Sequence, residues 1–145
     1  MQPKKIRHKR IQIIFFVSSV RSIAFIIRRQ IYIMIRLITK PNLFQLLRIW
    51  NQHYQILTTT RKKYTKKSLN EWYAKRGEIK HEVFGFFTAN TLKAFMVVKY
   101  KENNTFWIKQ LSCEKKECGK GYGTSLITFA VKEAKNMPIF SEVMV

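Results

Sequence analysis

The sequence ECGKGYGT, at residues 117–124, places three glycines between two segments of different periodicity. Residues 105–113 are rich in aromatic and β-branched residues and follow Asn103-Asn104, which is typical of a strand. After the glycines, apolar residues recur with helical spacing at Leu126, Ile127, Phe129, Ala130 and Ala134. A strand, a glycine-rich turn and a helix N-terminus predict an anion site, because glycines expose backbone N–H groups and the helix dipole favours negative charge.

Two common phosphate-binding motifs do not fit this spacing. A Walker A loop has Gly-Lys followed by Ser or Thr, whereas Gly121 follows Lys120. A dinucleotide fingerprint that begins at Gly119 requires Gly or Ala at the position of Thr124. An ordinary α/β turn, with glycines for tight packing, remains as an alternative.

The segment resembles the pyrophosphate loop of the GNAT (Gcn5-related N-acetyltransferase) superfamily. In that pattern, Gln or Arg is followed by two residues, Gly, one residue, and Gly or Ala. Gly121 and Gly123 fit the two glycine positions, while Cys118 stands where the family has Gln or Arg. The backbone N–H contacts that the family makes with pyrophosphate do not depend on the Cys118 side chain.

The order of predicted elements is also similar to a GNAT domain over residues 34–145. The resemblance implies an α/β fold of the acyl-CoA N-acyltransferase type, with a mixed, mostly antiparallel sheet flanked by helices. One helix is predicted to begin at a capping box of Ser68 and Glu71 and to end near Gly77. The chain ends before the family's last helix and hairpin, so we expect the C-terminal part of the fold to be missing. The predicted strands are 34–39, 81–88, 91–101, 105–113 and 139–145.

The charge is distributed unevenly along the chain. There are 28 Lys+Arg against 8 Asp+Glu, a net charge of +20, and the first acid is Glu71. This field attracts nucleic acid, anionic membrane or an anionic cofactor without distinguishing them. Residues 1–33 form a basic, apolar extension in which Arg21 interrupts the run Ile11–Ile27, so we expect no stable membrane insertion. Met34 is a candidate for the true start of a GNAT-like domain at 34–145, with Met1 as the alternative.

The two cysteines, Cys113 and Cys118, do not predict a disulfide framework or a zinc site. The three histidines, His8, His53 and His81, lack paired metal-ligand spacing. We therefore expect no metal, and we expect a reducing, cytoplasmic location.

The resemblance implies a site for acetyl-CoA as co-substrate. The pantetheine arm would bond the backbone of the strand at Leu111, Ser112 and Cys113, and the Thr124 hydroxyl and the Lys120 charge would add to the phosphate contacts. The pyrophosphate would bind to the turn formed by Cys118, Gly119, Lys120, Gly121, Tyr122, Gly123 and Thr124.

In the family, the acceptor amine attacks the thioester carbonyl directly. Histone-type members carry a glutamate base on the strand before the loop, at the position of Trp107 here. Glu82, on a neighbouring strand, is the candidate that could replace it through a water molecule. The tyrosine that protonates the leaving thiolate in many members would lie beyond Val145, so no acid is assigned.

The sequence thus predicts an acetyl-CoA-dependent N-acetyltransferase whose acceptor is an unidentified amine of a small molecule, a protein or a tRNA. One alternative is a truncated GNAT fragment that binds CoA with little activity. Another is a basic nucleic-acid-binding module formed by residues 61–67 with Trp50 and Tyr54. The unpaired edge of residues 139–145 favours self-association, with a homodimer as the candidate assembly.

Overall fold

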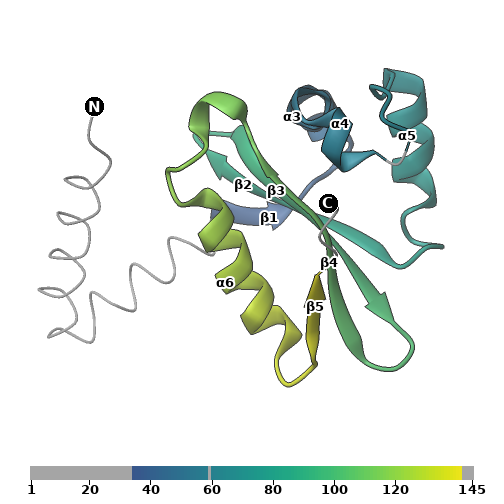
Figure 1. Ribbon diagram of the computed structural model, residues 1–145, viewed down its shortest axis with the longest axis vertical. Helices are drawn as coiled ribbons and strands as arrows, with labels where there is room; N and C mark the ends of the chain where they lie inside the picture. The colour runs from purple at the N-terminus through teal and green to yellow at the C-terminus, as the bar shows by residue number, and fades with distance from the viewer. Residues whose placement is uncertain (1–33, 59, 142–145) are drawn as a thin grey trace, which may run out of the picture. The chain divides into compact units, whose positions relative to one another are not determined.

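The computed structural model describes residues 34–58 and 60–141, which form a five-stranded sheet with flanking helices (Figure 1). The strands follow the chain order across the sheet, from β1 at one edge to β5 at the other. Neighbouring strands from β1 to β4 pair antiparallel, whereas β5 pairs parallel to β4. The predicted mixed, mostly antiparallel sheet is confirmed. The bounds are β1 Ile35–Leu37, β2 His81–Thr88, β3 Thr91–Lys101, β4 Thr105–Cys113 and β5 Ile139–Ser141.

Three helices cover one face of the sheet (Figure 1): α3 (Leu43–Gln52), α4 (Tyr54–Leu57) and α5 (Lys66–Lys75). A short 3-10 turn, η1 (Lys40–Asn42), leads into α3. The core on this side is centred on Trp50, which is 1% exposed and stacks on Phe95 of β3 with ring centroids 5.2 Å apart. The buried residues of α3, Leu43, Leu46, Ile49 and Trp50, recur with helical spacing, which puts their side chains on the side that faces the sheet.

A single helix, α6 (Tyr122–Ala134), packs on the opposite face. Phe129 of α6 contacts Phe84 of β2, with ring centroids 4.9 Å apart. Tyr122, in the first turn, contacts Phe86 with centroids 4.7 Å apart. The first turn and the middle of α6 thus pack against β2, and the first contact positions the glycine-rich turn that precedes the helix.

The N-terminus of α5 differs from its prediction. Its N-cap is Thr65 rather than Ser68, and the capping box joins these two residues: each side-chain oxygen accepts the backbone N–H of the other, at 3.1 and 2.9 Å. Both residue types are good N-caps, and the earlier one adds a turn to the helix. At the other end Arg76 is the C-cap, and Gly77 follows it.

The predicted extension at residues 1–33 and residues 142–145 of the predicted last strand lie outside the described residues. The predicted domain boundary at Met34 stays a prediction.

Candidate active site

Within the part of the chain that the structure describes, β4 and β5 pair over three residues. Phe106, Trp107 and Ile108 of β4 lie opposite the three residues of β5. On the other side of β4, Val98 pairs with Ile108 and Val97 with Gln110, which leaves Lys109 as a bulge. A bulge bends its strand, so the direction of β4 changes at this point.

Beyond Ile108, the edge of β4 on the β5 side pairs with no strand of residues 34–58 and 60–141. Glu114 donates its N–H to Lys93 O of β3 at 2.7 Å. Because successive residues of a strand direct their backbone groups to opposite edges, Ser112 also faces β3, whereas Leu111 and Cys113 face the other edge. The Cys113 carbonyl there lies 3.0 Å from His53 Nε2, which donates to it when protonated. Leu111 therefore lies on the same edge of β4 as the pairing with β5.

The turn after β4 depends on two glycines with left-handed backbone conformations. Gly119 has a φ angle of 85° and Gly121 one of 90°. L-residues with a Cβ rarely adopt these angles, so a larger residue at either position strains the turn. Gly121 is the N-cap of α6, and its carbonyl accepts the N–H of Ser125 at 3.0 Å.

The N-terminus of α6 presents N–H groups that the helix itself cannot use. In any helix the first N–H groups have no intrahelical acceptor, and here these belong to Tyr122, Gly123 and Thr124. Gly123 adds room, since a Cβ built on it would meet only Leu111 Cδ2, at 3.9 Å. The helix N-terminus, the open turn and the edge at Leu111 therefore lie side by side, in an arrangement suited to a phosphate group and the chain attached to it.

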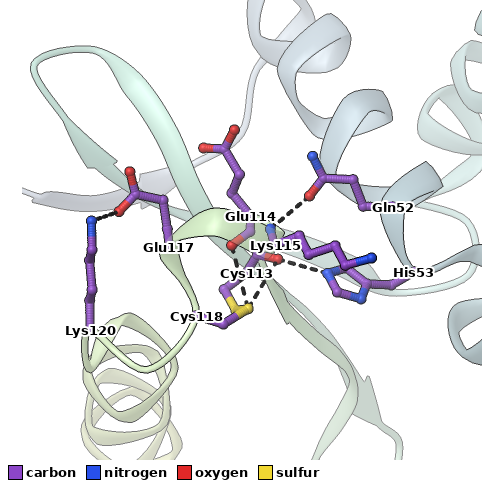
Figure 2. Close-up of a disulfide and its surroundings, with 8 residues drawn as sticks. All are labelled: Gln52, His53, Cys113, Glu114, Lys115, Glu117, Cys118 and Lys120. Atoms are coloured by element: carbon purple, nitrogen blue, oxygen red, sulfur yellow. Dashed lines mark hydrogen bonds and ion pairs between the residues drawn. A yellow bond between two sulfur atoms is a disulfide. The ribbon is translucent and has the colours of Figure 1, made fainter. Parts of the chain in front are cut away.

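The cysteines form a disulfide, which corrects the sequence analysis (Figure 2). Cys113 ends β4 and Cys118 lies in the turn, with their Cα atoms 5.6 Å apart. The turn η2 (Lys115–Glu117) reverses the chain between them and brings two residues five apart within bridging distance. The oxidised Cys118 sulfur lies 3.4 Å from Glu114 O but has no hydrogen to donate. A cysteine on either side of a predicted turn was the signal for this bond.

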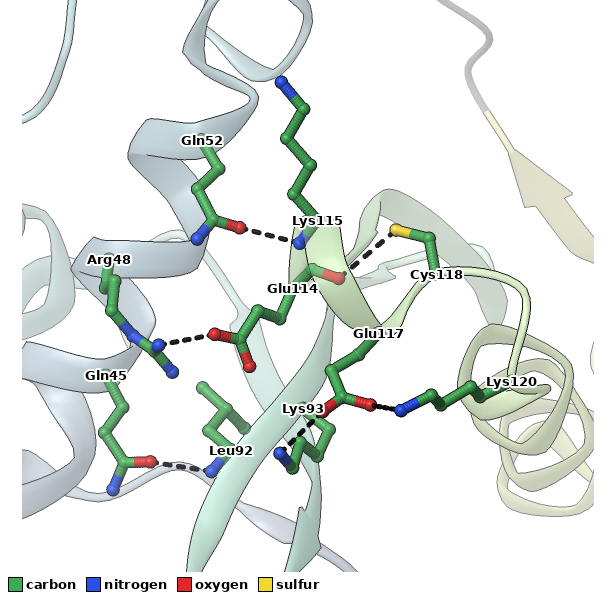
Figure 3. Close-up of polar contacts among 10 residues, drawn as sticks. All are labelled: Gln45, Arg48, Gln52, Leu92, Lys93, Glu114, Lys115, Glu117, Cys118 and Lys120. Atoms are coloured by element: carbon green, nitrogen blue, oxygen red, sulfur yellow. Dashed lines mark hydrogen bonds and ion pairs between the residues drawn. The ribbon is translucent and has the colours of Figure 1, made fainter. Parts of the chain in front are cut away.

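Polar contacts tie this turn to α3 (Figure 3). Arg48 forms an ion pair with Glu114, whose side chain is 12% exposed. Gln52 Oε1, one turn further along α3, accepts the backbone N–H of Lys115 at 2.8 Å. Together with His53 on Cys113, these contacts hold the end of β4 from one side of the sheet while the turn leads to α6 on the other.

Glu117 joins two cations at the turn (Figure 3). Lys120 and Lys93 both form ion pairs with its carboxylate. The hydrogen bond from Lys120, followed by that from Lys93, lowers the pKa of Glu117, and the same bond raises the pKa of Lys120. Lys120, the residue predicted to contact phosphate, is therefore already paired with the Glu117 carboxylate, which it shares with Lys93.

A cleft of about 500 Å³ occupies the space between β4 and β5. It is lined from both faces of the sheet: α4 contributes Ile56 and Leu57, and α6 contributes Ile127. Gln110 Nε2 donates to Leu57 O at 2.7 Å and connects β4 to α4. We call this space the β4–β5 cleft; its other lining residues are Ile108, Lys109, Leu111, Ile139, Phe140 and Ser141.

The predicted base, Glu82, does not line the β4–β5 cleft. It forms a hydrogen bond with Tyr100, whose pKa burial and the Glu82 charge raise to about 12. Trp107, at the position of the histone-type base, stacks on Phe140 of β5 with ring centroids 4.9 Å apart. Sequence reasoning missed Gln110 and Leu57, which become neighbours only through the fold.

Of the residues of the nucleic-acid alternative, Trp50 does not reach the surface. Trp50 is buried in the core, so its ring offers no face on which a base could stack. Tyr54 lies on α4 with Lys63 Nζ 5.5 Å from its ring centroid. Lys62, Lys63, Lys66 and Lys67 are exposed.

Within the described ranges, no group of three or more His, Cys, Asp and Glu side chains could hold a metal ion. Among the helices of those ranges, none combines the length and apolar character needed to cross a membrane.

Comparison with known proteins gives structural matches alone. No protein-family model matches the sequence, and no curated protein matches it. Solved structures do match, among them an N-acetyltransferase from Staphylococcus aureus Mu50 with a TM-score of 0.59, 22% identity and coverage of 70% of this chain and 66% of that one. A GNAT family acetyltransferase from S. aureus USA300_TCH1516 matches with a TM-score of 0.63, 15% identity and coverage of 77% and 86%.

The chain has the GNAT fold. The Salmonella typhimurium protein yncA, solved with its cofactor acetyl-CoA, matches with a TM-score of 0.58 and 16% identity. The match covers 70% of this chain and 62% of yncA. These structural matches establish the fold alone. Activity and acceptor are a separate question.

Proposed function

We propose that the protein is an acetyl-CoA-dependent N-acetyltransferase. The observation that carries this proposal is that the β4–β5 cleft lies beside the N-terminus of α6: Leu111 lines the cleft, and its side chain is the nearest group to Gly123 in the first turn of that helix. This places a helix N-terminus, the edge of β4 and the β4–β5 cleft next to one another. A molecule with a pyrophosphate at one end and a thioester at the other matches that arrangement.

The residues present fit acetyl-CoA. Backbone N–H groups from Cys118 to Thr124 would bind the pyrophosphate, which the left-handed Gly119 and Gly121 allow to approach closely. The pantetheine amides would pair with the edge of β4, as an added strand does, at Leu111 and beside Cys113. Ser112 would support this edge from within the sheet, because its backbone faces β3.

The acetyl group would then lie in the cleft, where an amine can reach it. The amine nitrogen attacks the thioester carbonyl, a C–N bond forms while the C–S bond breaks, the nitrogen loses a proton and the thiolate gains one. The protein contributes proximity and orientation, which together supply much of the rate of such reactions. Glu82 is hydrogen-bonded to Tyr100 and does not line the cleft. It would therefore accept the proton of the amine only through intervening water.

A CoA titration by calorimetry tests the site. Gly121→Val should weaken CoA binding by about tenfold or more, because it strains the turn and adds bulk where phosphate binds. Gly77→Val is the matched control: Gly77 follows α5, and a Cβ there meets nothing within 4 Å. Equal CoA affinity of the two variants would refute the site, provided that circular dichroism shows both folded.

A second measurement separates binding from turnover. Release of CoA thiol in the presence of acetyl-CoA and a panel of amines reports transfer directly. Trp107 occupies the position of the family's base, and loss of one positioned proton-transfer group removes a factor of about 10²–10⁴ in rate. Binding without thiol release would favour the alternative of a CoA-binding fragment with little activity.

A further inference from the structure

A second hollow lies beside the β4–β5 cleft, on the face covered by α3, α4 and α5. It measures about 470 Å³. Its lining includes two lysines, Lys62 and Lys63, and the hydroxyl-bearing residues Thr58, Thr60 and Ser68. We call it the basic pocket. A small hollow lined by cations and hydroxyl groups suits an anion with several oxygen atoms.

The basic pocket shares a wall with the cleft. Leu57 and Gln110 line both spaces. The wall is closed by the hydrogen bond from Gln110 Nε2 to Leu57 O, at 2.7 Å. The Gln110–Leu57 hydrogen bond therefore lies between the two spaces. A molecule bound in the basic pocket that extends past it would reach the part of the cleft where the acetyl group would lie.

The positive charge of the basic pocket is not balanced by its own lining, which contains no carboxylate. The carboxylates of the described residues that form ion pairs do so elsewhere: Glu102 with Lys80, Glu114 with Arg48, and Glu117 with Lys93 and Lys120. Lys63 contacts the ring of Tyr54, which leaves its charge in place.

The two lysines of the basic pocket also bear on the choice of acceptor. Like charges repel at short range, so an acceptor that carries only positive charge is a poor match for Lys62 and Lys63.

We infer that the acceptor is a phosphorylated amine, whose phosphate binds in the basic pocket while its amino group reaches the β4–β5 cleft. This inference rests on the proposed acetyl transfer. A phosphate dianion offers three oxygens to Lys62, Lys63 and the Thr60 hydroxyl, and its negative charge offsets the charge of the two lysines. The hydroxyls of Thr58 and Ser68 already donate to the carbonyl oxygens of Tyr54 and Thr65. The phosphate takes no part in the reaction; the amine exchanges a proton for the acetyl group, and CoA leaves as the thiol.

Aminoalkyl phosphates of increasing chain length provide the probes, with the amino alcohols of the same lengths as neutral controls. The value of kcat/KM for acetylation is measured for each pair, and calorimetry measures the binding of each aminoalkyl phosphate to the CoA-saturated protein. We expect the phosphates to be the better acceptors, with an optimum at the chain length that spans the Gln110–Leu57 bridge.

Two charge-matched double variants locate the effect. Lys62→Gln/Lys63→Gln removes both lysines of the basic pocket. Lys66→Gln/Lys67→Gln removes the same charge from the first turn of α5, and neither of these lysines lines the pocket. For exposed lysines we expect a loss of about tenfold in kcat/KM for the phosphates in the first variant and of about twofold or less in the second.

The outcomes separate the two proposals. If the protein does not bind CoA, the proposed function fails before the acceptor is considered. If it binds CoA and acetylates amino alcohols as well as their phosphates, or if both double variants lose equally, the basic pocket does not bind the acceptor and the inference is overturned. Loss confined to Lys62→Gln/Lys63→Gln and to the phosphates supports it.

Discussion

Reduction of the Cys113–Cys118 disulfide should lower the stability of the whole domain. In the oxidised protein, the bond joins two cysteines that are five positions apart in the sequence and so closes a short loop. It restricts the unfolded chain more than the folded one, because η2 and the contacts of α3 already fix the turn in the native state. Cys118 is exposed, so a dithiol reductant can reach the bond.

The size of the effect follows from the loop length. The chain-entropy relation gives about 7 cal/mol/K for so short a loop, which is about 2 kcal/mol at 25 °C. For the roughly 110 residues from Met34, the entropy of unfolding is about 0.23 kcal/mol/K. The midpoint of thermal unfolding should therefore fall by about 9 °C.

Thermal unfolding followed by circular dichroism, with and without dithiothreitol, measures this shift. The control is Cys113→Ser/Cys118→Ser, which should unfold near the midpoint of the reduced protein and should not respond to dithiothreitol. A thiol assay under denaturing conditions establishes the oxidation state of each sample.

Two results would contradict the reasoning. One is a pair of free thiols in protein purified without reductant, which would mean that the bond does not form. The other is an intact disulfide whose reduction leaves the midpoint unchanged, which would mean that the loop restricts the unfolded chain too little to matter.

Two further predictions concern the sheet. Gly85→Ala should lower the free energy of unfolding, measured in urea, by about 1–3 kcal/mol, because its Cβ would lie 2.5 Å from Leu92 Cδ1 and 2.7 Å from Phe87 Cε2 in the core. Gly77→Ala is the control, since a Cβ at Gly77 meets nothing within 4 Å. Equal urea midpoints of the two variants would refute the close packing at Gly85. His81 has a lowered pKa, so the unfolded state binds more protons than the folded state as pH falls from the ordinary value of 6.5 through the lowered one. Stability should fall with pH over that range in the native protein and less so in His81→Gln, whereas parallel profiles would contradict the lowered pKa.

The sequence was most informative where the local pattern and the tertiary packing favour the same structure. The three strands from His81 to Cys113 have strong β-branched and aromatic content and clear turns between them, and their predicted bounds match the structure. The glycine turn was predicted as well, because only glycine suits the φ angles of positions 119 and 121.

What the sequence did not reveal depends on contacts across the chain. The wall of the β4–β5 cleft joins Gln110 to Leu57, which are 53 residues apart, and no local pattern links them. The disulfide required knowing that η2 reverses the chain between the cysteines. The N-cap of α5 was misplaced because Thr65 and Ser68 are both good capping residues, and the reciprocal hydrogen bonds between them place the start of the helix at the earlier one.

The lining of the β4–β5 cleft by α4 on one face of the sheet and α6 on the other has a kinetic consequence. Under the proposed function, donor and acceptor approach from different sides and can be bound at the same time. Initial-velocity plots should then intersect, as in a sequential mechanism, instead of running parallel as they do when an acyl-enzyme forms first. Both cysteines of the chain are joined in the disulfide and offer no thiol for such an intermediate. Neither substrate has to leave before the other can enter.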